Sequence, residues 1–130
     1  MNKYIIHTLI IFIFVWAGAT ASRAYGWYFE YWYVDIILHA LSGIMFALIW
    51  TILAKGKINS IAIFMFGAVA TAVLGSFLWE CWEYWGYLLR PDFARFYIPE
   101  IEDTLTDMAA GMAGALLIYP FVRKIAIIKG

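Results

Sequence analysis

The sequence is poor in charge. Only 14% of its 130 residues are Asp, Glu, Lys or Arg, nine acidic residues balance nine basic ones, and 65% of the residues are apolar. The mean hydropathy is +0.82. This composition lies far from that of soluble domains and predicts a single transmembrane domain over residues 1–130. Without a basic excess we expect no nucleic acid as a partner, and instead expect membrane lipids and a possible membrane-protein partner.

Cysteine and histidine are also scarce. The single cysteine, Cys81, has no partner for an internal disulfide, and we interpret it as a packing residue. The two histidines, His7 and His39, fall toward opposite sides of the predicted membrane, which argues against a haem held between them. No Glu-x-x-His pair occurs, so the sequence pattern of di-iron carboxylate bundles is missing.

Four apolar segments are long enough to cross ~30 Å of hydrocarbon as helices. They cover residues 4–21, 34–54, 60–89 and 103–122. The aromatic-rich residues 22–33 suit a linker lying along the membrane interface. The third segment should end at Leu89, because helical geometry is disfavoured at Arg90, the residue before Pro91. A cleaved secretory signal is the alternative for the first segment, since Ala19-Thr20-Ala21 resembles a cleavage site.

The basic residues predict how the segments are oriented. One side of the predicted membrane collects Lys3, Lys55, Lys57, Arg123, Lys124 and Lys129, and the other collects Arg23, Arg90 and Arg95. The excess of positive charge marks the cytoplasmic side, so both termini should be cytoplasmic and the protein should lie in the cell (cytoplasmic or inner) membrane. The expected fold is an all-α integral membrane antiparallel bundle of four transmembrane helices.

Three pairs of ionisable residues stand at the predicted outer ends of the second, third and fourth segments. They are Asp35 with His39, Glu80 with Glu83, and Asp103 with Asp107. Spacings of three or four residues place each pair on one helical stripe, and the topology gives all three pairs a similar depth. The stripes continue to small residues, Gly43, Gly111 and Gly114, which allow helices to approach closely in lipid. We therefore expect the pairs to converge inside the bundle.

Five carboxylates at this depth need compensation by a cation, by shared protons or by the arginines of the outer side. Oxygen ligands with one histidine suit Mg²⁺ or Mn²⁺, with Zn²⁺ or Fe²⁺ as further options. We predict Asp35, His39, Asp103 and Asp107 as metal ligands. Glu80 or Glu83 would serve as a general base, and Arg90 or Arg95 would contact an anion.

Each of these residues also has a purely structural interpretation. Thr104-x-x-Asp107 fits a capping box with Asp at the third helical position, and Asp103 can itself be an N-cap. Asp35 can be a first-turn carboxylate that favours the helix N-terminus. The glutamates can snorkel to water from an aromatic belt. The arginines can be ordinary loop charges, and His39 can be a hydrogen-bonded residue of the bundle core.

Taken in order, these elements resemble a known group of proteins. Asp35-x-x-x-His39-x-x-x-Gly43, Trp79-Glu80-x-x-Glu83 and Asp103-x-x-x-Asp107-Met108 with Gly111 and Gly114 are similar to the pattern of VanZ-like membrane proteins, and most of all to its YjdF-like variant. The resemblance covers residues 34–115. Glu83 and Asp107 stand where the VanZ-like pattern usually has Gln and Asn. The resemblance implies a polytopic membrane protein with an important polar cluster, and it implies no particular reaction.

Three functions remain open at this point. The first is an enzyme that acts on a lipid-linked phosphate or ester with the help of a divalent cation. The second is a non-catalytic accessory or structural membrane subunit, which suits a short chain with little mass outside the membrane. The third is a proton- or cation-coupled transporter that uses the acids as a relay.

Overall fold

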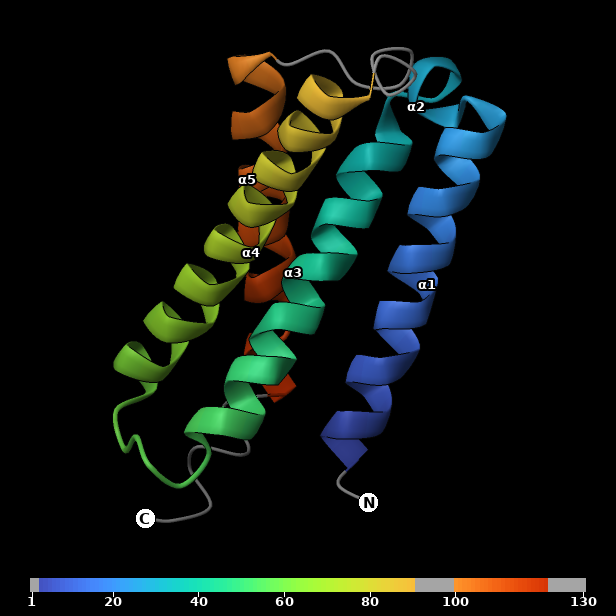
Figure 1. Cartoon of the computed structure of the whole chain (residues 1–130). Coiled ribbons are helices and arrows are strands. Elements are labelled where there is room, and N and C mark those ends of the chain that lie inside the picture. The colour runs from blue at the N-terminus through green and yellow to red at the C-terminus, as the bar shows by residue number, and fades with distance from the viewer. Residues whose placement is uncertain (1–2, 91–99, 122–130) are drawn as a thin grey trace.

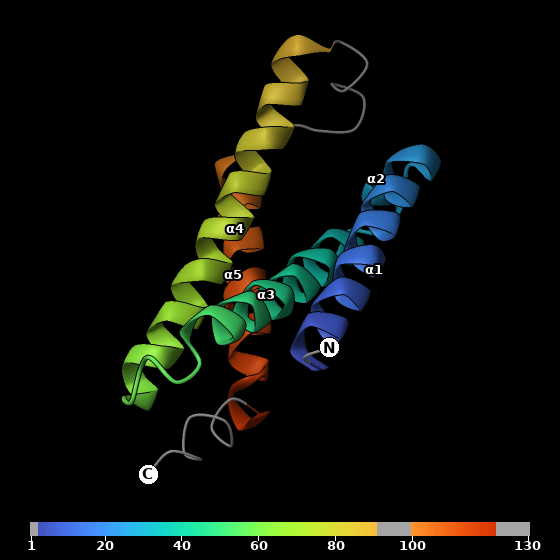
Figure 2. The same ribbon diagram turned by 60° about the horizontal axis from the view of Figure 1, so that its bottom comes forward.

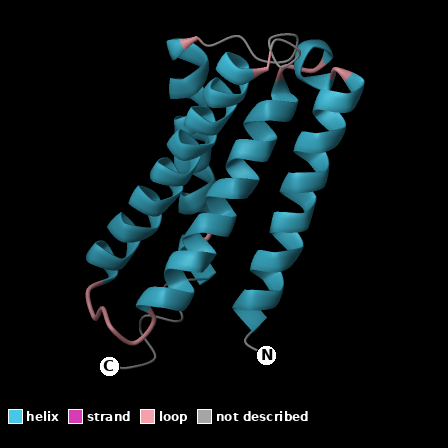
Figure 3. Cartoon of the chain, in the orientation of Figure 1, coloured by secondary structure: helices cyan, strands magenta, loops and turns pink. Residues whose placement is uncertain are grey.

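The computed structural model describes residues 3–90 and 100–121, and in these residues the only regular structure is helical (Figure 3). The helices are α1 (Lys3–Tyr25), α2 (Trp27–Glu30), α3 (Tyr33–Ala54), α4 (Ile61–Leu89) and α5 (Ile101–Leu117). Of these, α1, α3 and α4 are long and apolar enough to cross a membrane. The predicted all-α bundle is confirmed, with three long candidate spans and a shorter fourth helix.

Helix α3 occupies the centre of the bundle. It packs against α1, α4 and α5, and α4 also packs against α5, whereas α1 has little contact with either of them (Figures 1 and 2). The end of α1, the start of α3, the end of α4 and the start of α5 lie at the same end of the bundle as α2 (Figure 1). We call this the α2 end of the bundle. The direction in which the bundle crosses a membrane stays a prediction.

Helix α1 runs further than the sequence pattern indicated. It continues to Tyr25 instead of ending near residue 21, so the predicted interfacial linker is shorter and contains α2. The extra turn is packed, because Ser22 is fully buried. Gly26 then reverses the chain with a φ of 71°, a left-handed conformation that glycine adopts without steric cost. This longer helix brings Arg23 into the bundle.

The boundaries of α5 also differ from the expected span of 103–122. It starts at Ile101 with Glu100 as its N-cap, so Asp103 lies inside the first turn and the proposed capping box is wrong. It ends at Leu117, shortly before Pro120, which lacks the N–H needed to continue the helical hydrogen bonds. Seventeen residues rise about 26 Å, whereas the 29 residues of α4 rise about 43 Å.

Small residues allow α3 and α5 to touch through their backbones. A side chain at Gly43 would collide with the carbonyl of Gly111, and one at Gly114 would collide with the carbonyl of Ala40. Below this contact the core consists largely of buried alanines, with Ala47 among those that are fully enclosed. The glycines thus determine how closely the polar residues above them can approach.

The outer surface is strongly apolar. On α1, Ile13 and Phe14 are 63% and 68% exposed, and on α4 Phe66 is 76% exposed. Side chains of this size gathered on the outside of apolar helices suit a hydrocarbon environment and would be unfavourable in water.

Candidate metal centre

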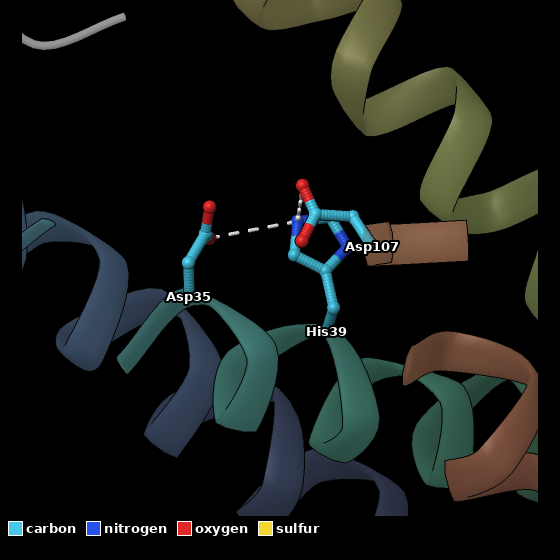
Figure 4. A group of neighbouring side chains, drawn as sticks. All are labelled: Asp35, His39 and Asp107. Atoms are coloured by element: carbon cyan, nitrogen blue, oxygen red, sulfur yellow. Dashed lines mark ion pairs between the residues drawn. The ribbon is translucent and has the colours of Figure 1, made fainter. Parts of the chain in front are cut away.

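Three carboxylates surround one imidazole nitrogen near the α2 end of the bundle. His39 Nε2 lies 3.6 Å from Asp35 Oδ1, 3.6 Å from Glu80 Oε1 and 3.6 Å from Asp107 Oδ2. Figure 4 shows Asp35 of α3 and Asp107 of α5 directed toward the same ring nitrogen of His39. His39, Glu80 and Asp107 are buried, with 3%, 5% and 1% of their surface exposed. Three separate helices therefore contribute to one enclosed polar cluster.

The register of the helices explains why the cluster forms. Gly43 follows His39 by one helical turn, Gly111 follows Asp107 by one turn, and Ser76 precedes Glu80 by one turn on the oppositely directed α4. These three residues meet, because a side chain on Gly111 would collide with Ser76 Oγ and one on Gly43 would collide with Gly111. A layer of small residues thus draws the three helices together directly beneath the polar cluster.

The distances at His39 are too long for hydrogen bonds, which bring N and O to 2.7–3.2 Å. One imidazole nitrogen can in any case donate to only one acceptor at a time. Ligands that share an ion through bonds of ~2.1 Å stand about 3.0 Å apart in octahedral geometry and about 3.4 Å apart in tetrahedral geometry. The separation of 3.6 Å is therefore close to that between ligands of one metal ion.

Asp35, His39 and Asp107 also lie close to one another. Each offers one ligand atom, and these atoms all lie within 4.8 Å of one another. Within the described part of the chain, the buried atoms His39 Nδ1 and Asp107 Oδ2 lack a hydrogen-bond partner. Buried polar atoms without a partner are rare in folded proteins. An ion bound at Nε2 and Oδ2 would satisfy the aspartate, so the residues fit a metal.

Glu80 has contacts on both sides of its carboxylate. Its Oε1 faces His39 Nε2, and its Oε2 accepts a hydrogen bond of 3.3 Å from Thr104 Oγ1 on α5. Glu80 also interacts with the Asp107 carboxyl group. This position, next to the three-ligand group and held by Thr104, suits either a fourth ligand or a base.

Arg23 supplies the positive charge at the edge of the cluster. Its Nη2 lies 3.1 Å from Glu83 Oε1 and joins α1 to α4. The guanidinium group also stacks over two indole rings, 5.4 Å from the Trp79 centroid and 5.0 Å from the Trp82 centroid. This cation–π arrangement fixes the arginine in place.

The other predicted site residues lie elsewhere. Asp103 is exposed in the first turn of α5 and is not part of the three-residue group. Helical side chains tilt toward the N-terminus, so a side chain in the first turn tends to project beyond the helix end. Arg90 is exposed at the end of α4, and Arg95 lies outside the described residues.

Sequence reasoning missed the supporting residues Ser76 and Thr104. The signal for Ser76 was its position one turn from Glu80. Thr104 stands three residues before Asp107, but that spacing was assigned to a capping box.

Tyr28 of α2 lies near the cluster, at the α2 end of the bundle. Burial raises the pKa of its phenol above the usual range, and the nearby Asp35 carboxylate raises it further. Tyr28 therefore stays neutral and keeps its hydroxyl proton at any ordinary pH. It closes one side of the site with a hydrogen-bond donor that carries no charge.

The exposed apolar helices around a buried polar cluster define the class of the protein, a multi-pass helical membrane protein. The chain belongs to the DUF2238 family of predicted membrane proteins, whose family model matches residues 3–126 and so extends over all the described helices. Comparisons with curated proteins and with solved structures give no match.

Proposed function

We propose that Asp35, His39 and Asp107 bind a divalent cation, and that the resulting site cleaves or transfers a phosphate or ester group linked to a lipid. One observation carries the proposal: three carboxylate oxygens from three helices stand at the same 3.6 Å from one buried imidazole nitrogen. Burial of this much negative charge is unfavourable without a counter-ion. A divalent cation provides the counter-ion and also gives the otherwise unpaired Asp107 oxygen a partner.

The ligand chemistry suggests which ion to test first. Carboxylate oxygens suit Mg²⁺ and Mn²⁺, and an imidazole ligand favours Mn²⁺ over Mg²⁺. Zn²⁺ and Fe²⁺ are the next candidates, because three protein ligands with room for one more is a common arrangement in catalytic zinc sites. We therefore place Mn²⁺ first, Mg²⁺ second, and Zn²⁺ or Fe²⁺ after them.

A bound cation would polarise an ester or phosphoryl oxygen and increase the acidity of water at the site. Glu80 is the residue that would accept a proton, because its Oε1 faces the cluster while Thr104 holds Oε2. Glu83 holds Arg23 at the rim, where the guanidinium group can attract an anionic headgroup. The aromatic rings beside Arg23 shield this charge pair from lipid.

The metal proposal is tested by the metal content of the purified protein. The protein is purified in mild detergent, loaded with Mn²⁺, desalted and analysed by inductively coupled plasma mass spectrometry. We expect about one ion per chain, and its loss in Asp107→Asn. Asp103→Asn is the matched control, because it removes an aspartate one turn away on the same helix and should keep the ion. Equal metal content in both variants would refute the proposal.

The catalytic proposal needs a separate measurement. Release of phosphate or fatty acid from lipid substrates is followed with Mn²⁺ and with a chelator. Glu80→Gln should keep the ion and lose turnover by roughly 10²–10⁴-fold, the usual contribution of a general base. A Glu80→Gln protein that turns over at the wild-type rate would refute this role.

We also propose that the site faces the extracytoplasmic side of the cell membrane. The distribution of Lys and Arg supports this orientation. Reporter fusions to the C-terminus decide it: alkaline phosphatase should be inactive there, and a fluorescent protein should be bright. The opposite result would place the cluster on the cytoplasmic side.

The layers beneath the cluster disfavour the transport alternative. Below the contact of Gly43 with Gly111 the described core is formed by fully buried alanines such as Ala47, Ala72 and Ala115. Thr51, one turn further along α3, donates its hydroxyl proton to the carbonyl of Ala47. A proton or cation leaving the site in this direction would meet no chain of polar side chains among the described residues.

A further inference from the structure

A cavity of about 380 Å³ lies between α1, α3 and α4 and adjoins the metal centre. Asp35 and His39 form part of its wall, while Phe12, Trp16, Leu78 and Trp79 give it an apolar lining. The volume falls in the range of small-molecule pockets, and at ~30 Å³ per water-sized group it has room for on the order of a dozen such groups. One end of the cavity is polar, and the rest is apolar.

The packing of α1 produces this cavity. Gly18 brings α1 close to Leu38, because an added Cβ would stand 2.7 Å from Leu38 Cδ2, and Gly75 brings α4 onto Phe46 of α3. Between these contacts α1 and α4 stay apart, each with a row of aromatic side chains. Arg23 and Glu83 then connect the two helices near the α2 end. Residues of α1, α3 and α4 thus form most of the wall of the cavity.

His39 connects this cavity with the metal centre. Its Nε2 faces the three carboxylates, and its Nδ1 is buried without a hydrogen-bond partner. The cavity and the candidate metal centre thus share Asp35 and His39, and an ion held by these residues would stand at the polar end of the cavity.

We infer that the cavity binds the hydrocarbon chain of a single-chain lipid phosphate whose headgroup lies at the polar end formed by Asp35 and His39. The inference rests on the proposed function and specifies its substrate class. A helix of a partner protein, ~10–12 Å across, is too wide for 380 Å³. Water alone is disfavoured, because apolar cavities stay dry. An anionic headgroup would meet the cation at Nε2 and the Arg23 guanidinium group nearby.

Photo-crosslinking tests where the chain binds. The full-length protein in nanodiscs is mixed with lysophosphatidic acid that carries a diazirine near the end of its acyl chain, irradiated, and mapped by mass spectrometry. We expect labels on Phe12, Trp16 and Leu78, and competition by unlabelled lysophosphatidic acid. Lysophosphatidylcholine should compete less well, because its headgroup has no net negative charge. Labels spread evenly over outward-facing residues such as Phe66 would overturn the inference.

A pair of variants on α1 sharpens the test. Val15→Trp fills the cavity, whereas Ile13→Trp adds the same side chain to the outer face of the same helix. Val15→Trp should reduce labelling at Leu78 by at least roughly tenfold, equivalent to ~1.4 kcal/mol of binding, with metal content unchanged. Ile13→Trp should label like the wild type. Equal labelling in both variants would overturn the inference.

The possible failures are distinguishable. A protein that binds metal but shows no labelling of the cavity contradicts this inference alone. A protein with a labelled cavity and no metal contradicts the proposed function. In that case only the binding of the lipid's hydrocarbon chain in the cavity is supported. Farnesyl phosphate, as a competitor beside lysophosphatidic acid, decides whether the preferred chain is isoprenyl or acyl.

Discussion

Replacing Asp107 by Asn should change stability with opposite signs in the presence and absence of metal. The substitution keeps the shape of the side chain and an acceptor oxygen, and it removes one negative charge from a residue that is 1% exposed. Without an ion, Asp107 repels the Asp35 carboxylate, whose ligand atom lies within 4.8 Å. Two ionised carboxylates at this separation interact by about 3.5 kcal/mol at an effective dielectric of 20. The variant should therefore be more stable than the wild type in a chelator.

With metal the order reverses. An ion present at 100 times its Kd stabilises the native state by about 2.7 kcal/mol, and the variant loses this contribution when its affinity falls by ~100-fold or more. The measurement is thermal unfolding in detergent, followed by tryptophan fluorescence, with excess Mn²⁺ and with a chelator. The wild type should show a large increase in Tm on addition of metal, and Asp107→Asn should show little or none.

The control and the refuting result follow from the same geometry. Asp103→Asn should respond to Mn²⁺ like the wild type, because Asp103 is exposed and outside the ligand group. If Asp107→Asn loses the same stability in chelator as in Mn²⁺, the aspartate acts only as a structural hydrogen-bonding residue. In that case the explanation of the 3.6 Å spacing by a shared ion is wrong.

Three further predictions concern the surroundings of the site. Gly114→Leu should push α5 away from the α3 backbone and destabilise the protein by about 1–3 kcal/mol in thermal unfolding, whereas Met112→Leu on the exposed face should have no such effect. Arg23→Gln should lower the free energy of unfolding by about 1–3 kcal/mol, because it leaves the buried Glu83 unpaired. Adding Glu83→Gln should restore part of this loss, and no recovery in the double variant would contradict the pairing. Glu80→Gln should keep one Mn²⁺ per chain by mass spectrometry, and loss of the ion would make Glu80 a ligand instead of a base.

The helices were the predictable part of this protein. Hydropathy indicates apolar segments of membrane-spanning length, and Pro91 limits the third of them for a reason that depends only on the local backbone. The turn after α1 was placed too early, because the end of that helix depends on tertiary contacts. Ser22 is buried and Arg23 meets Glu83 sixty residues away, which no local pattern reports.

The sequence predicts which candidate site residues share a helical face, but it does not predict which of them enter the site. The i, i+4 spacing indicates that Asp103 and Asp107 share a face with Gly111, and the spacing treats the two aspartates alike. The difference between them comes from depth. Asp107 lies one turn above the backbone contact between Gly111 and Gly43, where the helices are closest, whereas Asp103 lies a further turn outward in the first turn of α5. A register of this kind between helices depends on three-dimensional packing.

His39 joins the two proposals into one thermodynamic system. An ion at Nε2 requires an unprotonated nitrogen there and would stand at the polar end of the cavity, beside the lipid headgroup. A phosphate headgroup and the ion attract each other, so the bound lipid favours the ion. Because linkage is reciprocal, the ion and the lipid must strengthen each other's binding by the same factor. The candidate metal centre and the cavity thus share Asp35 and His39, and the occupancy of one site determines the affinity of the other.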